Sequence, residues 1–355
     1  MMDGIVLLSC ARSRIGDSLK SADDTAPRDF RGCLDHMGNA ENAQPWGISG
    51  VRRNTLSELL CADIHALLRQ NASVRDGVGD NAPEPYGNFT AHLSAANSGT
   101  GTWENGWHIV ASDIKKNQIA VKKSGVVFWV ETHEVKCCGR MDSTMSCSVR
   151  TPKEVKNLDA DYFIIFGNLS HVGGEDSTGD VVNFYWNLTA ASAIDFVQLC
   201  TNVLNRERLH FKAKVLSDPR AFVHAEAGIL SINRVDLQET LPIVFDMYRQ
   251  LEGKIKPATP LFSKHLADGL GFAEEPTSNH RLGHARAKII ADAVNDCLRQ
   301  GHGPKEEILQ SVRQRFVNEG IDPMLPYALK KHVAEYEQLF ASITKIYTQQ
   351  EEELT

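Results

Sequence analysis

The chain has 355 residues, of which 42% are hydrophobic and 23% charged, a composition typical of soluble globular proteins with one large domain or two ordinary ones. Its formal net charge of -7 disfavours a general nucleic-acid-binding protein, because such proteins usually carry an excess of basic residues. No run of residues approaches the length of a membrane span, and the apolar run 5–8 is too short for a signal sequence. We therefore expect a cytoplasmic protein that binds neither nucleic acid nor membranes.

The eight cysteines are scattered through the chain, and most lie in apolar segments, as Cys200 does. This pattern predicts free, buried thiols in a reducing compartment. Cys137 and Cys138 lie near Cys147 in the sequence, but they lack the paired spacing and the histidines of a zinc site. No cysteine has a convincing histidine partner for thiol catalysis, and we expect neither a metal ion nor another cofactor.

The first 50 residues are polar and rich in Gly, Asp, Asn and Arg, which predicts an irregular N-terminal segment. A helix is expected to begin at the capping box 55–58, because an apolar stripe of Leu and Ile follows it. The loop 71–88 carries Gly, Pro, Asp and Asn and is the best candidate for an internal boundary.

Short β-rich runs separated by turn residues dominate the middle of the chain. Strands are predicted at 107–112, 119–123, 126–131, 147–150, 161–167 and 181–188. They are followed in order by a helix at 190–206, strands at 209–216 and 228–233, and a helix at 236–251.

The last hundred or so residues are predicted to be helical, with one helix ending at Gly301, another beginning at Pro304 and a last one over 327–347. Strands in the middle with helices at both ends indicate an α+β fold, with a central, mostly antiparallel sheet flanked by helices and a helical C-terminal third. We divide the chain into an irregular segment, an α+β domain and C-terminal helices packed on that same domain: 1–50, 51–303 and 304–355.

The first candidate for chemistry is the strand LHFKAKVL, 209–216. On a strand, His210, Lys212 and Lys214 fall on one face and the apolar side chains fall on the other. Repulsion among three such groups favours a neutral lysine that can act as a base, and the same face attracts a phosphate dianion. The alternative is that these side chains lie on a solvated sheet face.

The next segment, FVHAEAGIL, places His224 and Glu226 two residues apart, after the Asp218–Pro219 turn. If it pairs with the preceding strand, both side chains can face the lysines, and the carboxylate can orient His224 as a general acid. The alternative is an exposed cross-strand charge pair that contributes little to stability.

A third segment, NHRLGHARAKII, places Arg281, His284, Arg286 and Lys288 at the start of a helix. Backbone N–H groups at a helix N-terminus, together with arginine side chains, can form an anion site. The alternative is a basic cluster on the protein surface.

Five runs follow one another along the chain: AANSGTGTWENGW, VVNFYWNLTAASA, LHFKAKVLSDPRAFVHAEAGIL, PATPLFSKHLADGLGFAEEP and LGHARAKIIADA. In this order they resemble the HopA-type effector family, and the resemblance covers residues 55–300. That family includes a type III effector of bacterial plant pathogens. It also includes enzymes from gene clusters for ribosomally made peptides, notably thioamitides and class V lanthipeptides.

The resemblance implies a phosphothreonine-lyase-like α+β fold that needs no metal. It implies a partner Ser/Thr kinase, resembling aminoglycoside phosphotransferases, that phosphorylates a precursor peptide. The lyase then eliminates phosphate and leaves dehydroalanine or dehydrobutyrine. Such a β-elimination needs a base for the Cα proton, an acid for the leaving phosphate and cations for its charge.

The resemblance also assigns roles to residues. The lysine of the family's Phe-x-x-Lys strand corresponds to Lys214, and Lys212 is an additional neighbour. His224 and Glu226 stand where Arg-x-Asp is expected, and 281–283 reads Arg-Leu-Gly where Ser-Phe-Gly is usual. These changes would alter phosphate binding, move the acid role to His224 or mark lost activity. The Phe-Tyr-Trp-Asn run at 184–187, Lys264 and Arg286 fit the family pattern.

We therefore predict a phosphoserine/phosphothreonine lyase that acts on a phosphorylated precursor peptide in ribosomal peptide natural-product biosynthesis. The predicted catalytic residues are Lys214 as base, Lys212 as second choice, and His210 or His224 as acid. The predicted phosphate ligands are Arg286, Arg281 and Lys264, and the predicted peptide-binding residues are Tyr185, Asn187, Trp107 and Glu226.

Two alternatives stay open. One is a non-catalytic effector or scaffold that binds a host protein or the partner kinase. The other is a phosphopeptide-binding module that keeps the cations and lacks a working base.

Overall fold

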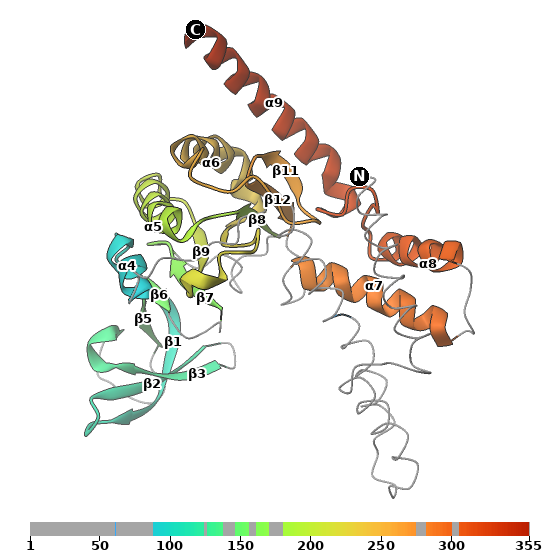
Figure 1. Cartoon of the computed structure of the whole chain (residues 1–355). Helices are drawn as coiled ribbons and strands as arrows, with labels where there is room; N and C mark the ends of the chain where they lie inside the picture. The colour runs from blue at the N-terminus through green and yellow to red at the C-terminus, as the bar shows by residue number, and fades with distance from the viewer. Residues whose placement is uncertain are drawn as a thin grey trace, which may run out of the picture. The chain divides into compact units, whose positions relative to one another are not determined.

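The computed structural model describes Cys61 and residues 88–123, 126–137, 146–155, 161–169, 180–274, 282–299 and 305–354 (Figure 1). The predicted irregular segment 1–50, the capping box at 55–58 and most of the loop 71–88 lie outside these residues. Cys61 is helical, in agreement with the helix predicted around it.

The contacts of the chain divide it into two compact units, whose bounds differ from the predicted segments. We call Ser73–Thr277 with Ala334–Thr355 the sheet unit, and Met1–Ala72 with Ser278–Val333 the helical unit. The described helices of the helical unit include α7 (Leu282–Arg299) and α8 (Lys305–Asn318), and α9 (Lys330–Leu354) begins there and continues in the sheet unit.

The sheet unit begins with α4 (Phe89–Ala96) and a five-stranded sheet in the order β3-β2-β1-β5-β4. Its strands are β1 (Thr102–Asp113), β2 (Gln118–Lys123), β3 (Val126–Glu131), β4 (Val135–Cys137) and β5 (Ser146–Thr151). Alternate side chains of these strands form a small core of their own, which includes Trp107, Val121 and Val149. At the β3 edge, Val127 and Trp129 are exposed.

A seven-stranded sheet in the order β11-β12-β8-β10-β9-β7-β6 forms the main layer of the sheet unit. Its strands are β6 (Glu154–Val155), β7 (Tyr162–Phe166), β8 (Val181–Trp186), β9 (Phe211–Leu216), β10 (Gly228–Asn233), β11 (Lys264–Ala267) and β12 (Leu270–Glu274). All the described strand pairs are antiparallel. The predicted α+β class with antiparallel pairing is therefore confirmed, although the strands form two sheets and not one.

One face of the seven-stranded sheet packs against helices. Trp186 of β8 contacts Phe196 of α5 (Ala190–Leu199) and Tyr248 of α6 (Leu237–Leu251), with ring centroids 5.4 and 6.5 Å apart. Phe272 of β12 contacts Phe340 of α9 at 4.9 Å. We call this side of the sheet the helix-covered face, and Figure 1 shows α5, α6 and α9 beside the sheet.

Most predicted elements are present. The helix at 190–206 is α5 followed by a π-helical turn, Cys200–Leu204, and short 3-10 turns occupy Thr132–Glu134, Pro219–Ala221 and Arg234–Asp236. The sequence does not predict β4, β6, β11 or β12, because each is short, and β12 contains Gly271 within a brief apolar run. In such short runs the two-residue period is hard to recognise.

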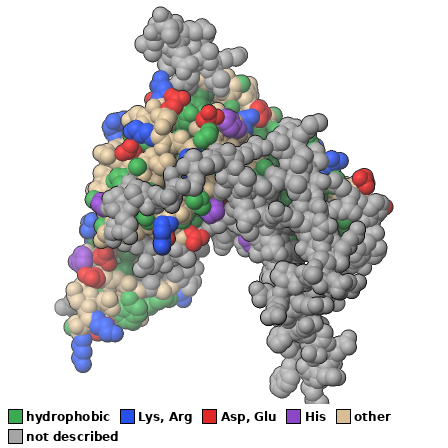
Figure 2. Space-filling model, viewed as in Figure 1, with side chains coloured by type: hydrophobic (Ala, Val, Ile, Leu, Met, Phe, Trp, Pro, Cys, Tyr) green, Lys and Arg blue, Asp and Glu red, His purple; other side chains and the backbone are tan. Residues whose placement is uncertain are grey.

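The surface of the described residues carries both signs of charge. On the face drawn in Figure 2, Lys and Arg side chains are interspersed with Asp and Glu. No helix among the described residues has both the length and the apolar character needed to cross a membrane.

Replacing Phe184 by Ala is expected to destabilise the sheet unit by about 3–5 kcal/mol, because the ring is fully buried and a cavity would remain beside Phe272. Urea unfolding followed by circular dichroism measures this change. Val127→Ala is the control, because half of the Val127 side chain is exposed at the β3 edge. Equal effects of the two substitutions would contradict the described core.

Candidate functional site

Lys212 and Lys214 lie on the same side of β9, near the middle of the seven-stranded sheet. Phe211, Ala213 and Val215 are buried, whereas both lysines are half-buried, so the predicted alternation is confirmed. The neighbours of β9 are β7 and β10. The two lysines therefore belong to an interior strand of the sheet and not to an edge strand.

The strand register shows which side chains share this surface, because residues directly opposite each other on antiparallel strands point to the same side. Lys214 lies opposite Ile164 and Ile229, and Lys212 lies opposite Ser231. We call this side the lysine face. Its members are Tyr162, Ile164, Phe166, Asn183, Tyr185, Lys212, Lys214, Ile229, Ser231, Gly271 and Ala273.

A buried polar pair lies on the lysine face beside Lys212. Ser231 of β10 donates a hydrogen bond from its hydroxyl to Oδ1 of Asn183 on β8, over 2.6 Å. The two residues are 2% and 3% exposed. Ser231 stands between Lys212 and Asn183 in the register, so these three polar side chains form one row across three neighbouring strands.

His210 does not lie on β9. The chain leaves the preceding helical turn through Arg208, which has a positive φ of 57°, and the N–H of Leu209 still bonds to the carbonyl of Leu204. The strand begins at Phe211, so His210 lies just before it, although the buried Leu209 and the half-buried His210 continue the alternation of burial. The prediction that His210 belongs to the same strand is wrong by one residue.

His224 and Glu226 lie in a turn and not on a strand, which corrects the predicted pairing with the lysine row. Asp218 caps a 3-10 turn by accepting from the N–H of Arg220, and β10 does not begin until Gly228. The places opposite the lysines are therefore taken by residues of β10.

This turn nevertheless contacts the lysine face. Tyr162, on that face, donates its hydroxyl hydrogen to the backbone carbonyl of Glu226 over 2.9 Å. Phe222 packs edge-on against Phe89 of α4, with ring centroids 5.6 Å apart. Glu226 is buried and His224 is half-buried.

Lys264 lies on the opposite side of the sheet from the two lysines of β9. It stands opposite Phe272 of β12, on the helix-covered face. Its ammonium group donates to both carboxylate oxygens of Glu337 on α9, at 2.7 and 2.9 Å, and lies 5.7 Å from the ring centroid of Phe340. The structure therefore does not bring Lys264 together with Lys212 and Lys214.

The predicted peptide-binding residues are placed in different surroundings. Tyr185 is buried on the lysine face, in the row of Lys214 and Ile229. Asn187 is buried just after β8, where its amide group donates to the carbonyl of Ala258. Trp107 belongs to the core of the five-stranded sheet and so does not share a surface with the lysines.

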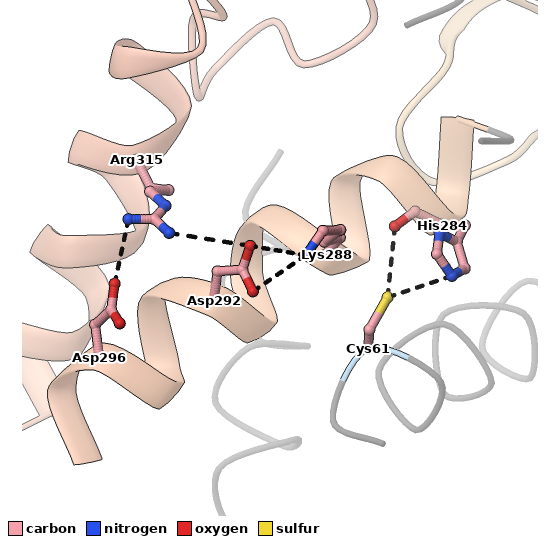
Figure 3. Close-up of polar contacts among 6 residues, drawn as sticks. All are labelled: Cys61, His284, Lys288, Asp292, Asp296 and Arg315. Carbon is pink, nitrogen blue, oxygen red and sulfur yellow. Dashed lines mark hydrogen bonds and ion pairs between the residues drawn. The ribbon is translucent and has the colours of Figure 1, made fainter. Parts of the chain in front are cut away.

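The basic residues of α7 make contacts within the helical unit. Arg286 is 4% exposed and its Nε donates to the carbonyl of Pro326. Lys288 pairs with Asp292 at 3.1 Å, and Arg315 of α8 pairs with Asp296 at 3.2 Å (Figure 3). The contacts of Arg286 and Arg315 connect α7 with its neighbours in the unit, whereas the Lys288–Asp292 pair lies within α7. Arg281 lies outside the described residues.

Cys61 contacts the first turn of α7. Its sulfur lies 3.7 Å from Nε2 of His284 and donates to the carbonyl of that residue over 3.6 Å (Figure 3). The sequence did not indicate this contact between a cysteine and a histidine. Burial raises the pKa of the Cys61 thiol, opposed by the nearby Lys288. A thiol held in its protonated form is a poor nucleophile, so this pair does not resemble a catalytic one.

Cys137 and Cys147 stand directly opposite each other on β4 and β5, and both are free. Burial, and then the neighbouring Cys137, raises the pKa of the Cys147 thiol to about 11. Cys147 is 4% exposed and forms part of the core of the five-stranded sheet.

An open groove of about 490 Å³ runs along α4 and α5. It is lined by His92, Ala95, Ala96, Ser98, Ile194, Gln198 and Asn202. None of the predicted site residues lines it. Its polar side chains bond to one another, since Ser98 donates to Asn202.

Sequence reasoning missed Ser231 and Asn183. Each is a single polar residue inside an otherwise apolar strand, GILSIN and VVNFYW. That interruption is a usable signal, because a buried polar group is costly unless it is hydrogen-bonded. Only the register shows that the two residues meet each other next to Lys212.

The family model described as the HopA1 effector protein family matches residues 154–328. The matched segment runs from β6 through β12 and on through α7 and α8. The predicted resemblance to the HopA-type effector family is thereby confirmed over that segment. No curated protein matches the chain.

The solved structures that are similar to the chain include two effector proteins of Pseudomonas syringae. The effector protein from Pseudomonas syringae pv. tomato strain DC3000 is 15% identical, with a TM-score of 0.44, and the match covers 78% of this chain and 95% of that one. The effector protein from Pseudomonas syringae pv. syringae strain 61 is 14% identical, with a TM-score of 0.41 and coverages of 79% and 98%.

The raised pKa of Cys147 predicts a loss of stability at alkaline pH. The stabilisation is present below pH 9, because the thiol is then protonated in both states, and it is lost as the unfolded thiol ionises. Under reducing conditions, the free energy of unfolding is expected to fall by about 2 kcal/mol between pH 9 and pH 11 from this group. Urea unfolding at each pH measures the loss, which should be smaller in Cys147→Ala. An identical pH profile in that variant would contradict the assignment.

Proposed function

We propose that the protein is a phosphoserine/phosphothreonine lyase that eliminates phosphate from a phosphorylated peptide and leaves dehydroalanine or dehydrobutyrine. The observation that carries the proposal is the pair of half-buried lysines on one face of β9, within the segment that matches the HopA1 family. One lysine can serve as a base and the other as a cation for phosphate, the two functions that the reaction needs in one place.

The assignment of Lys214 as the base rests on its surroundings. In the register it lies between Ile164 and Ile229, which are 4% and 7% exposed, and Tyr185 follows in the same row. A lysine between two apolar neighbours suits the role of a base, which must reach the Cα proton as a neutral amine.

In the reaction, Nζ of Lys214 takes the proton from Cα of the phosphorylated residue. The electron pair of the broken C–H bond forms the Cα–Cβ double bond, the Cβ–O bond breaks, and phosphate leaves with its electrons. A general acid protonates the leaving phosphate, and we assign this role to His224, with His210 as the second candidate. The products are the dehydrated peptide and inorganic phosphate, so the balance needs no water.

The remaining assignments follow the resemblance. Tyr185 and Glu226 are proposed as contacts to the peptide, whereas the roles of Arg286 and Arg281 as phosphate ligands stay predictions of the resemblance. We leave Lys264 out of the site, because its ammonium group is engaged by Glu337 on the helix-covered face. We also propose that the substrate is a precursor peptide of a ribosomal natural product, phosphorylated by a partner kinase that resembles aminoglycoside phosphotransferases.

A second candidate is a binding protein without catalytic activity. The description of the matching family as effector proteins favours it, since effectors include proteins that act by binding. Such a protein would engage a host protein or the partner kinase. A phosphopeptide-binding module without a working base is the intermediate case.

The wild-type protein, incubated with peptides carrying phosphoserine or phosphothreonine, is expected to release phosphate and leave a dehydrated residue. Intact-mass measurement separates this product from that of hydrolysis, because the hydrolysed peptide retains one more water. Binding without turnover would favour the phosphopeptide-binding module. The absence of both binding and turnover would favour the effector without catalytic activity.

Lys214→Ala is expected to lower the elimination rate by about 10²–10⁴-fold, the usual contribution of a general base, with an unchanged unfolding transition. The matched control is Lys254→Ala, which removes a lysine that is 57% exposed and pairs with Asp195. Full activity in Lys214→Ala and its loss only in the double variant with Lys212→Ala would assign the base to Lys212. Full activity in the double variant would exclude both.

A further inference from the structure

The row of Lys212, Ser231 and Asn183 differs from the row of Lys214 beside it. Lys214 has isoleucine on both sides, whereas Lys212 has Ser231 on one side and Phe166 on the other. The two lysines share a strand and a face and differ in what lies next to them.

The ammonium group of Lys212 makes no hydrogen bond or ion pair with any residue that the structure describes. Lys264 on the opposite side of the sheet shows the contrast, because its charge is compensated by Glu337. A half-buried ammonium group without a protein partner is suited to an anionic ligand, since a charge removed from water gains most from a counter-charge.

The hydrogen bond between Ser231 and Asn183 has a defined donor and acceptor. Ser231 gives its only hydroxyl hydrogen to Asn183, so the lone pairs of the Ser231 oxygen remain available as acceptors. Directly opposite residues have Cβ atoms about 5 Å apart, and the side chain of Lys212 is long enough to reach that oxygen.

We propose that Lys212 is the cation that binds the phosphate of the substrate, and that Ser231 and Asn183 are positioning residues, with Ser231 offering an acceptor that the ammonium group takes up when phosphate is bound. This inference rests on the proposed lyase function and deepens it, because it separates the roles of the two lysines. Lys214 removes the proton, and Lys212 holds the leaving phosphate. Ser231 and Asn183 do not contact the substrate and act through Lys212.

The test measures KM and kcat for a phosphopeptide and, separately, the inhibition constant of inorganic phosphate, which is the product. Lys212→Met keeps the side-chain stem and removes the charge. It is expected to weaken phosphate inhibition about tenfold or more and to raise KM, as the loss of a charged hydrogen bond does. Lys214→Ala is expected to lower kcat. Its dissociation constant for phosphate, measured directly by calorimetry, should stay unchanged.

Ser231→Ala is expected to weaken phosphate inhibition about threefold and to raise KM with little change in kcat, because the ammonium group loses an oriented acceptor. Ser231→Thr keeps the hydroxyl and should restore the affinity. Thr240→Val is the matched control, because Thr240 of α6 is also fully buried and donates its hydroxyl hydrogen to the backbone carbonyl of Asp236, just before that helix. Thermal unfolding of each variant separates loss of folding from loss of affinity.

The inference is overturned if the wild type eliminates phosphate while Lys212→Met changes kcat alone, or if Ser231→Ala behaves as Thr240→Val does. If Ser231→Ala does not fold, Lys212→Met still decides the role of Lys212, since its side chain is half-buried and can be changed without altering the core. A wild type that eliminates no phosphate from any phosphopeptide would instead refute the proposed function.

Discussion

The register of β9 between β7 and β10 decides which side chains can meet in the sheet unit. Antiparallel pairing holds Lys212 opposite Ser231 and Lys214 opposite Ile229. A slip of one residue would turn both lysines into the helix-covered face, where Trp186 and its neighbours fill the space. The backbone hydrogen bonds that stabilise the sheet therefore also determine which side chains lie next to one another on the lysine face. In this unit the fold and the candidate site depend on one set of backbone contacts.

The sequence alone was sufficient for what depends on local pattern. The alternation of LHFKAKVL predicts one face for Lys212 and Lys214, and the structure has it. The position of His224 was not predictable in the same way, because Asp218 caps a short 3-10 turn and delays the next strand. The side of the sheet on which Lys264 lies depends on the register of the four strand pairs between β9 and β11, and the last of these pairs has an irregularity. Neither follows from spacing along the chain.

The sequence shows Ser231 and Asn183 as single polar residues in apolar strands. Only the fold shows that they bond to each other. A single serine in a buried strand is compatible with many structures. A serine that bonds to an asparagine two strands away from Lys212 is a specific arrangement. Satisfied polar groups of this kind specify one packing of a sheet, because any shift of register would leave them buried without partners.

The three lysines of the seven-stranded sheet have different surroundings. Lys264 is neutralised by Glu337 and stabilises the contact between β11 and α9. Lys214 stands among isoleucines, and Lys212 stands beside a serine and has no anionic partner among the described residues. One residue type thus has three different environments within one sheet. Since the free energy of an ammonium group is set by its surroundings, the three cannot perform the same function. Within the part of the chain that the structure describes, the lysine face therefore presents one lysine without an anionic partner, Lys212, and one that lies opposite two isoleucines, Lys214.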